Sequence, residues 1–208
     1  MKPLVIDIYH NDPVESFQEI KDAGIRAIIH KASEGSRRDQ LYEHRRQAFV
    51  DLGFKWGAYH FFHGNGKAEA DFFLSAAQPD ENTLLALDWE PTPNGVTPSY
   101  AAARAFLERI EEKLGRKAVV YSGNVAKEQI KGRDAFFGDH RLWLAQYAAH
   151  WKTQASWDKP WLWQYGSEAT KSRVQGIRGY CDVNNILDAD EEEFFKNWVE
   201  PPPAPRTA

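Results

Sequence analysis

The stretch that decides the fold of this chain is Leu84-Leu85-Ala86-Leu87-Asp88-Trp89-Glu90-Pro91. Its apolar beginning is typical of a buried β-strand. Because alternate residues of a strand face the same side, Asp88 and Glu90 are predicted to point together into one space. Pro91 favours extended backbone at Glu90 and lacks the N–H of a sheet residue, so the strand should end soon afterwards. The stretch therefore predicts two neighbouring carboxyl groups at a strand end.

Two interpretations of this carboxylate pair are open at this point. Two acids at a strand end suit the cleavage of a glycosidic bond, in which one carboxyl group protonates the leaving oxygen and another acts on the cationic sugar. The alternative is a solvated strand end followed by a proline turn, because acids are common where loops begin. The rest of the chain must decide between the two.

Strand-like apolar runs recur along the chain, and helical patterns lie between several of them. The predicted strands are residues 4–8, 25–30, 56–62, 84–90, 118–122, 142–147, 161–165 and 181–186. The predicted helices are residues 14–23, 39–52, 67–77 and 99–114, which stop at a glycine or before a proline. Alternating strands and helices indicate parallel βαβ units. We therefore predict an α/β fold, a single-domain, TIM-barrel-like (β/α) barrel of eight strands, with a reduced and irregular set of helices after Gln129.

Polar residues follow the predicted strands in a way that core packing does not explain. Those within or just past a strand end are Asp7, Lys31, His60, Asp88, Glu90, Tyr121, Gln164 and Asp182. In a β/α barrel the active site forms at the C-terminal ends of the strands. Carboxylates are poor strand-interior residues and are costly to bury unpaired. Their presence in the first, fourth and last strands therefore favours an active site over a solvated strand end.

Composition excludes several other classes of protein. An apolar content of 42% and a charged content of 27% are typical of a globular domain, and 208 residues suffice for a full core. The net charge of −4 and the pI of about 6.0 argue against a nucleic-acid partner. A single cysteine, Cys181, allows no internal disulfide. No run approaches the ~20 apolar residues of a membrane span.

Eight short motifs follow one another along the chain. They are Val5-Ile6-Asp7-Ile8, Ile29-His30-Lys31-Ala32-Ser33-Glu34-Gly35, Gly57-Ala58-Tyr59-His60-Phe61, Ala86-Leu87-Asp88-Trp89-Glu90, Val120-Tyr121-Ser122, Leu142-Trp143-Leu144-Ala145-Gln146-Tyr147, Trp163-Gln164-Tyr165 and Gly179-Tyr180-Cys181-Asp182-Val183-Asn184. In this order and spacing, the chain resembles the family 25 glycoside hydrolases, the muramidase-type lysozymes, from about residue 4 to residue 198.

The resemblance implies an enzyme that cleaves the β-1,4 bond between N-acetylmuramic acid and N-acetylglucosamine in peptidoglycan, with retention of configuration. It implies catalytic roles for Asp7, Asp88, Glu90 and Asp182. Predicted substrate-binding residues are Tyr59, Phe61, Tyr121, Trp143, Tyr147 and Gln164. We expect a monomer that uses no metal and no cofactor.

Roles within the acid group follow from the chemistry. Glu90 is predicted as general acid/base, with a pKa raised by the neighbouring carboxylate. Asp88 is expected to stay ionised and to orient the substrate's N-acetyl group as an internal nucleophile. Asp7 and Asp182 would stabilise the oxocarbenium-like state. Direct attack by Asp88 or Asp182 is an open alternative.

Two segments depart from the family pattern. They are Tyr9-His10-Asn11-Asp12, after the first aspartate, and Ser36-Arg37-Arg38-Asp39, after the lysine motif. We expect both at the rim of the groove, where they bear on fine substrate preference and not on the type of reaction.

The two ends of the chain carry further predictions. The first residues hold too short an apolar run for a signal peptide, so we expect a cytoplasmic protein that is released as phage endolysins are, or one exported by another route. The Pro-rich residues 200–208 are predicted to be a flexible tail after a catalytic domain of residues 1–199.

Rival interpretations remain. A non-catalytic peptidoglycan-binding barrel would keep the aromatic groove and lose an essential acid. A chitinase-like hydrolase would require an aspartate where this chain has Ala86.

Zinc binding by His60 and His63 is disfavoured, because residues three apart on a strand face opposite sides. Lys31 and Glu34 either pair with each other or contact substrate. Cys181 is expected to be a small buried apolar residue rather than a nucleophile.

Overall fold

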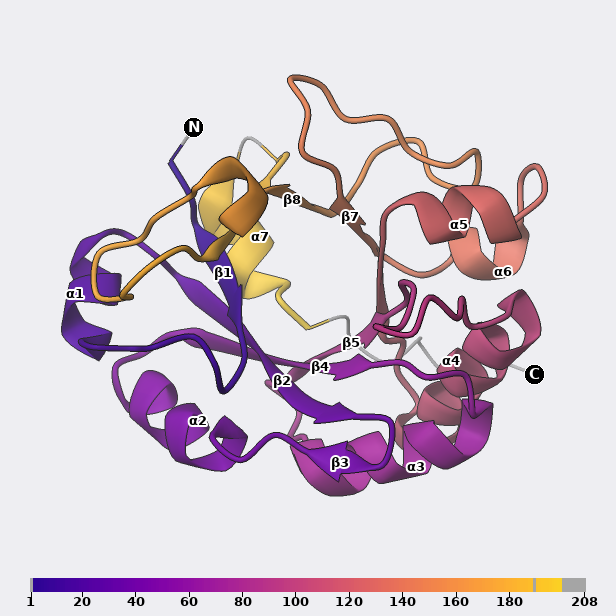
Figure 1. Ribbon diagram of the computed structural model, residues 1–208, viewed down its shortest axis with the longest axis horizontal. Coiled ribbons are helices and arrows are strands. Elements are labelled where there is room, and N and C mark those ends of the chain that lie inside the picture. Colours follow the sequence, from indigo (N-terminus) through magenta and orange to yellow (C-terminus); the bar gives the residue numbers. More distant parts are fainter. Residues whose placement is uncertain (1, 189, 200–208) are drawn as a thin grey trace.

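The computed structural model describes residues 2–188 and 190–199, and within them eight strands close into a barrel (Figure 1). The barrel strands are β1 (Val5–Ile8), β2 (Ala27–Glu34), β4 (Lys55–Phe61), β5 (Leu84–Asp88), β6 (Val119–Ser122), β7 (Leu142–Ala145), β8 (Leu162–Gly166) and β9 (Asp182–Ile186). Closure occurs because β1 pairs with β2 on one side and with β9 on the other. The predicted (β/α)-barrel fold is confirmed.

Strand direction differs from the prediction at one position. Neighbouring strands from β1 through β8 run parallel, whereas β9 is antiparallel to both β8 and β1. A parallel connection needs a crossover, usually a helix, that carries the chain back along the sheet. The segment between β8 and β9 holds only a three-residue 3₁₀ turn, η1 (Glu168–Thr170). The last strand therefore enters the barrel from the end at which β8 left it.

A short strand that we did not predict, β3 (Arg37–Arg38), extends the sheet beyond the barrel. It pairs antiparallel with the end of β2, so that Ser33 lies opposite Arg38 and Glu34 opposite Arg37. As a result, β2 runs four residues past the predicted end at His30.

Helices cover the outside of the first half of the barrel (Figure 1). They are α1 (Phe17–Asp22), α2 (Tyr42–Asp51), α3 (Gly66–Ala77), α4 (Tyr100–Leu114), α5 (Asn124–Gln129), α6 (Ala135–Gly138) and, near the end, α7 (Glu191–Lys196). Helix α1 begins later than predicted because Val14 bridges to Ile177 and Ser16 caps the helix, accepting a hydrogen bond from Glu19 N–H. Between α6 and α7 the described residues form no α-helix, as the weak periodicity there indicated.

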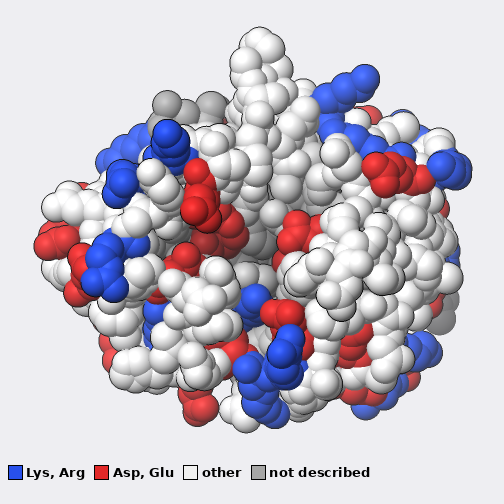
Figure 2. All heavy atoms as spheres, in the orientation of Figure 1, with Lys and Arg blue, Asp and Glu red and all other residues white. Residues whose placement is uncertain are grey.

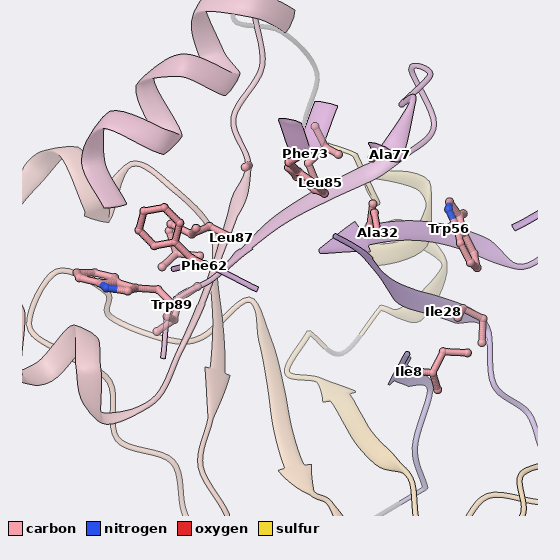
Figure 3. Packing of buried hydrophobic residues seen from close by; sticks show 14 of the residues in the cluster. Ile8, Ile28, Ala32, Trp56, Phe62, Phe73, Ala77, Leu85, Leu87 and Trp89 are labelled. Carbon is pink, nitrogen blue, oxygen red and sulfur yellow. The ribbon is translucent and has the colours of Figure 1, made fainter. Parts of the chain in front are cut away.

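Two layers of apolar side chains hold the barrel. The outer layer lies between strands and helices, and it includes Leu85 and Leu87 of β5 together with helix residues such as Phe73 and Ala77 (Figure 3). The inner layer fills the barrel, and Leu84 and Ala86 contribute to it. Because alternate residues of β5 face opposite layers, Asp88 continues the inward-facing row.

Trp89 fixes the chain just after β5. Its side chain is fully buried in the outer layer, and its indole N–H donates to the Pro98 carbonyl at 2.8 Å. Its backbone N–H donates to the carbonyl of Tyr121, and its own carbonyl accepts from the Ser122 hydroxyl. With Trp89 anchored outward, Glu90 is carried to the inner side, although β5 itself ends at Asp88.

Two further predictions concern the ends of the chain and membranes. Among the described residues, every helix is too short or too polar to cross a bilayer. The last described segment packs into the base of the barrel, where Trp198 is buried and its indole N–H donates to the Trp56 carbonyl. The predicted tail, residues 200–208, lies outside the described residues.

Candidate active site

Inward-facing polar residues of several strands meet at one mouth of the barrel. Asp7 is in β1 and Asp88 ends β5, while Glu90 follows Asp88 by two residues. Asp182 is the first residue of β9, and the reversed direction of β9 brings it to the same end, in register with Asp7. The strand reversal therefore completes a group of four acids.

These acids line a cavity of about 230 Å³. Figure 2 shows acidic side chains on both sides of a central hollow. The wall also contains the aromatic residues that we predicted as substrate contacts, Tyr59, Phe61, Tyr121 and Trp143. The cavity thus combines carboxyl groups with flat apolar faces, a combination that suits a sugar ring.

Asp88 and Glu90 are held without strong partners. Asp88 is 6% exposed, and its Oδ1 has no hydrogen-bond partner among the described residues. Burial, and then the charge of Glu90, raise the pKa of Asp88 well above its usual value. Burial also raises the pKa of Glu90, while the charge of Lys31 opposes this rise.

The pKa shifts of Asp88 and Glu90 differ in part from those that we predicted. The pKa of Glu90 is raised as expected, but burial rather than the neighbouring carboxylate is the main cause. Asp88, which we expected to be ionised, also has a raised pKa in the unliganded protein. Both carboxyl groups therefore keep their protons to higher pH than solvated acids do.

Asp7 and Asp182 are held much more firmly. Asp7 accepts hydrogen bonds from the Gln164 amide, at 3.0 Å to each oxygen, and from the Asn184 amide at 2.7 Å. Burial raises the pKa of Asp7 to about 7 in spite of these bonds. Burial, the charges of Asp7, Asp12 and Glu90, and a hydrogen bond with Asp7 together raise the pKa of Asp182 to about 9. At neutral pH, Asp182 is therefore protonated and donates to Asp7.

Gln164 lies behind Asp7 rather than on the cavity wall. Its side chain is fully buried, and its Oε1 accepts from the hydroxyl groups of Tyr121 at 2.9 Å and Tyr147 at 2.6 Å. Since its amide N–H groups point to Asp7, both ends of this side chain are occupied within the protein. Gln164 is therefore placed to orient Asp7, and its predicted contact with substrate stays a prediction.

Tyr147 also lies outside the cavity wall, but its side chain is 45% exposed. The hydroxyl group points to Gln164, while much of the residue remains accessible beside the groove. Its predicted contact with substrate stays a prediction.

Asn184 is a site residue that the sequence analysis did not identify. Its amide donates to Asp7 and to the Val5 carbonyl, and its Oδ1 accepts from the Trp143 indole N–H at 2.6 Å. The available signal was its position in β9, two residues after Asp182 and therefore on the same inward face.

Lys31 and Glu34 pair with each other on the wall of the cavity. Lys31 Nζ lies 3.1 Å from Glu34 Oε2 and 4.6 Å from the centre of the Tyr9 ring. Burial alone would raise the pKa of Glu34, but the hydrogen bond and charge of Lys31 lower it, with help from Arg37. Glu34 is therefore ionised and neutralises much of the local positive charge.

His60 and Cys181, which could in principle bind a metal or act as a nucleophile, have structural roles. Both ring nitrogens of His60 are occupied, by the Ser33 hydroxyl at 2.8 Å and by Glu69 at 2.7 Å, and the ring is fully buried. Cys181 is buried, and burial raises the pKa of its thiol well above the usual value, which disfavours the nucleophilic thiolate.

Comparison with known proteins identifies a matching family and similar solved structures. Residues 6–174 match the sequence pattern of "Glycosyl hydrolases family 25". A lysozyme structure from Streptomyces coelicolor, 24% identical, covers 91% of this chain and 94% of its own with a TM-score of 0.82. A muramidase structure from Acremonium alcalophilum is 26% identical over 91% of this chain and 95% of its own, with a TM-score of 0.78.

A curated relative, the autolytic lysozyme of Clostridium acetobutylicum, is 26% identical over 88% of this chain. The present chain spans between 55% and 65% of the length of the curated relatives that it matches. The sequence match, residues 6–174, includes Asp7, Asp88 and Glu90 but ends before Asp182, and in the structure all four acids line one cavity. We conclude that the chain belongs to glycosyl hydrolases family 25.

Proposed function

We propose that this protein hydrolyses the β-1,4 bond between N-acetylmuramic acid and N-acetylglucosamine in the peptidoglycan of bacterial cell walls. The observation that carries the proposal is the carboxyl pair of Asp88 and Glu90, which lies in a cavity of about 230 Å³ with Asp88 Oδ1 unpartnered among the described residues.

Glu90 acts as general acid and then as general base. Burial keeps its carboxyl group protonated at higher pH than in water, as donation to the glycosidic oxygen requires. Lys31 limits this rise of the pKa, so that the proton can also be released. The same group then takes a proton from the attacking water, which accounts for a retaining reaction in two steps.

Asp88 orients the acetamido group of the sugar. Its free Oδ1 accepts the acetamido N–H, and this hydrogen bond favours the ionised form of Asp88. With Asp88 ionised, the proton that the leaving oxygen needs resides on Glu90 when substrate is bound. The acetamido oxygen is turned toward the anomeric carbon as internal nucleophile. Asp7, held by its amide partners, supplies negative charge near the oxocarbenium-like state, and Asp182 supports Asp7 by a hydrogen bond.

The test is reducing-end release from purified peptidoglycan, with the new ends identified by mass spectrometry after borohydride reduction. Wild type should generate muramitol ends, and Glu90→Gln should lose at least about a thousandfold in kcat, because the amide cannot donate a carboxylic proton. Glu168→Gln, on the exposed η1 turn, is the matched control and should retain wild-type activity.

Other outcomes identify the rival functions. Binding to peptidoglycan without release of any reducing ends would indicate a non-catalytic barrel. Release of N-acetylglucosamine ends from chitin oligomers, with none from peptidoglycan, would indicate a chitinase-like hydrolase. That outcome is disfavoured by Ala86, a fully buried residue without a carboxyl group at the position where the chitinase motif needs one.

A further inference from the structure

A second cavity adjoins the catalytic one. We call it the rim cavity; its volume is about 450 Å³, and both segments that depart from the family pattern contribute to it, through Tyr9–Asn11 and Arg37–Asp39. It shares Tyr9, Lys31 and Glu34 with the catalytic cavity, so that the two spaces are continuous along one wall. Substrate in the catalytic cavity is therefore within reach of the rim cavity.

The two cavities differ in charge. The four acids of the site line the catalytic cavity, with Lys31 and Glu34 on the wall that the two cavities share. The rim cavity adds the cationic side chains of Arg37 and Arg38, against one further acid, Asp39. Figure 2 shows basic side chains gathered over β3, at the edge of the central hollow. A negatively charged ligand group is thus favoured in the rim cavity and disfavoured beside the catalytic acids.

Both acids of the rim cavity are already hydrogen-bonded by protein groups. Asp39 accepts from the backbone N–H groups of His10 and Leu41 and contacts His10 Nδ1 at 2.7 Å. Glu34 is paired with Lys31 at 3.1 Å and with Arg37 at 3.3 Å. Both carboxylates are therefore occupied by protein groups, and the cationic side chains that line the cavity outnumber them.

The two arginines of β3 keep free hydrogen-bonding capacity. Arg37 has a side chain that is 77% exposed, and only one of its nitrogens contacts Glu34. Arg38 donates to the Ser75 hydroxyl at 3.1 Å, and it forms no ion pair within the part of the chain that the structure describes. Because a guanidinium group carries five N–H donors in a planar fork, both residues can still bind a carboxylate.

We propose that the rim cavity binds the acidic peptide attached to muramic acid, with Arg37 and Arg38 as the carboxylate-binding residues. This inference rests on the proposed function. Each muramic acid carries a lactyl group linked to a short peptide with free carboxyl groups, so that every scissile bond has such a peptide beside it. Phosphate-bearing wall polymers are attached much more sparsely along the glycan, and most cleavage events would leave the cavity without them.

The experiment compares two substrates that differ only in charge. Glycan strands with their peptides are freed of phosphate polymers with hydrofluoric acid, and half of the sample has its carboxyl groups converted to methylamides. Wild type should cleave the native strands with a kcat/KM roughly fivefold to tenfold higher than the amidated strands, as expected for two solvent-accessible arginine–carboxylate contacts. In the double variant Arg37→Gln/Arg38→Gln this ratio should fall to about one.

The control is Arg133→Gln, which alters an exposed arginine paired with Asp158 and should keep the wild-type ratio. A wild-type ratio of one, or a double variant that keeps the full ratio, would overturn the proposal. The same variants are also assayed on peptidoglycan that retains its phosphate polymers. If the double variant loses activity only on that substrate, the rim cavity binds those polymers instead. If wild type releases no reducing ends from either substrate, the proposed function fails, and that result is distinct from an unchanged ratio.

Discussion

The two carboxyl pairs at the mouth of the barrel are built in opposite ways. Asp88 and Glu90 come from one strand end, and Asp88 has an oxygen without a partner in the described structure. Asp7 and Asp182 come from the first and last strands, are hydrogen-bonded to each other, and are further fixed by two buried amides. The first pair is free to exchange protons and bind a ligand, whereas the second pair is fixed in place.

This difference indicates how one cavity can hold four acids. Burying several carboxylates together is unfavourable unless some are protonated or hydrogen-bonded. Asp182 meets this requirement by keeping its proton, and Asp7 by its amide donors. Asp88 and Glu90 lack such partners among the described residues, and burial of their ionised forms is unfavourable. Their pKa values are raised as a result, and a raised pKa is also what proton transfer requires.

If the Asp88–Glu90 pair performs the chemistry, Asp88→Asn should have a large effect on activity, second only to that of Glu90→Gln. The amide keeps the shape of the side chain but removes the charge that supports the acetamido nucleophile, so we expect kcat to fall roughly 100-fold to 1000-fold. Steady-state reducing-end release measures this. Asp139→Asn, an exposed residue paired with Lys117, serves as control. An Asp88→Asn enzyme with more than a tenth of wild-type kcat would place the chemistry elsewhere.

The variant Gln164→Leu tests the role of the Asp7–Asp182 pair. Leucine has a similar size but removes both donors to Asp7, so we expect kcat to fall about 10-fold to 100-fold with little change in KM. Because these hydrogen bonds lower the pKa of Asp7, their loss should raise that pKa above about 7. If ionised Asp7 is required, the acidic limb of the pH–rate profile then moves to higher pH. A uniform loss of activity with an unshifted profile would indicate a structural role only.

The same contrast explains which site residues could be predicted from the sequence. Asp88 and Glu90 are two residues apart on one strand, so local alternation was enough to place them on one face. The position of Asp182 depends on a strand reversal between β8 and β1, which no local pattern encodes. The sequence analysis listed Asp182 among the acids of the strands, and its catalytic role was implied only by the resemblance to the family.

Gln164 and Asn184 show a second limit of prediction from the sequence. Both amides face inward, as strand alternation indicates, but whether such a group meets substrate or another protein group depends on contacts between strands far apart in sequence. Gln164 contacts Asp7 across 157 residues, and Asn184 contacts it across 177. The sequence analysis could place Gln164 in the site but could not identify its contact with Asp7.

The fold could be predicted best where helices and strands alternate. Helix α4 begins after its Ser99 cap and ends at Gly115, which adopts the left-handed conformation that favours glycine. Strand β3 was missed because two consecutive arginines carry no apolar alternation; the strand forms through pairing with β2. After α6 the strands β7, β8 and β9 were predicted, but the connections between them hold no α-helix and therefore leave no helical periodicity in the sequence.

Asp182→Asn should increase stability in a pH-dependent way. The pKa of Asp182 is about 9 in the folded protein, against an ordinary value of 3.8, so between these values the folded state holds a proton that the unfolded state releases. The free energy of unfolding therefore falls as pH rises through this window. Asparagine does not titrate, and we expect the variant to gain on the order of 2 kcal/mol at pH 8, about 5 °C in Tm, with little gain at pH 4. Thermal unfolding at both pH values measures this, and an equal gain at both would contradict the assignment.

The smallest effect is expected for Tyr147→Phe, which separates the two roles of this residue. Its hydroxyl group donates to Gln164 Oε1, but Tyr121 donates to the same atom, so that the amide stays oriented when one donor is lost. We therefore expect kcat to change by no more than about threefold, since a single neutral hydrogen bond contributes about 0.5–1.5 kcal/mol and here has a substitute. Tyr147→Ala also removes the exposed ring, and KM should rise if that ring contacts the glycan. Equal KM values for the two variants would remove Tyr147 from the substrate contacts and leave it, like Gln164, as part of the support behind Asp7.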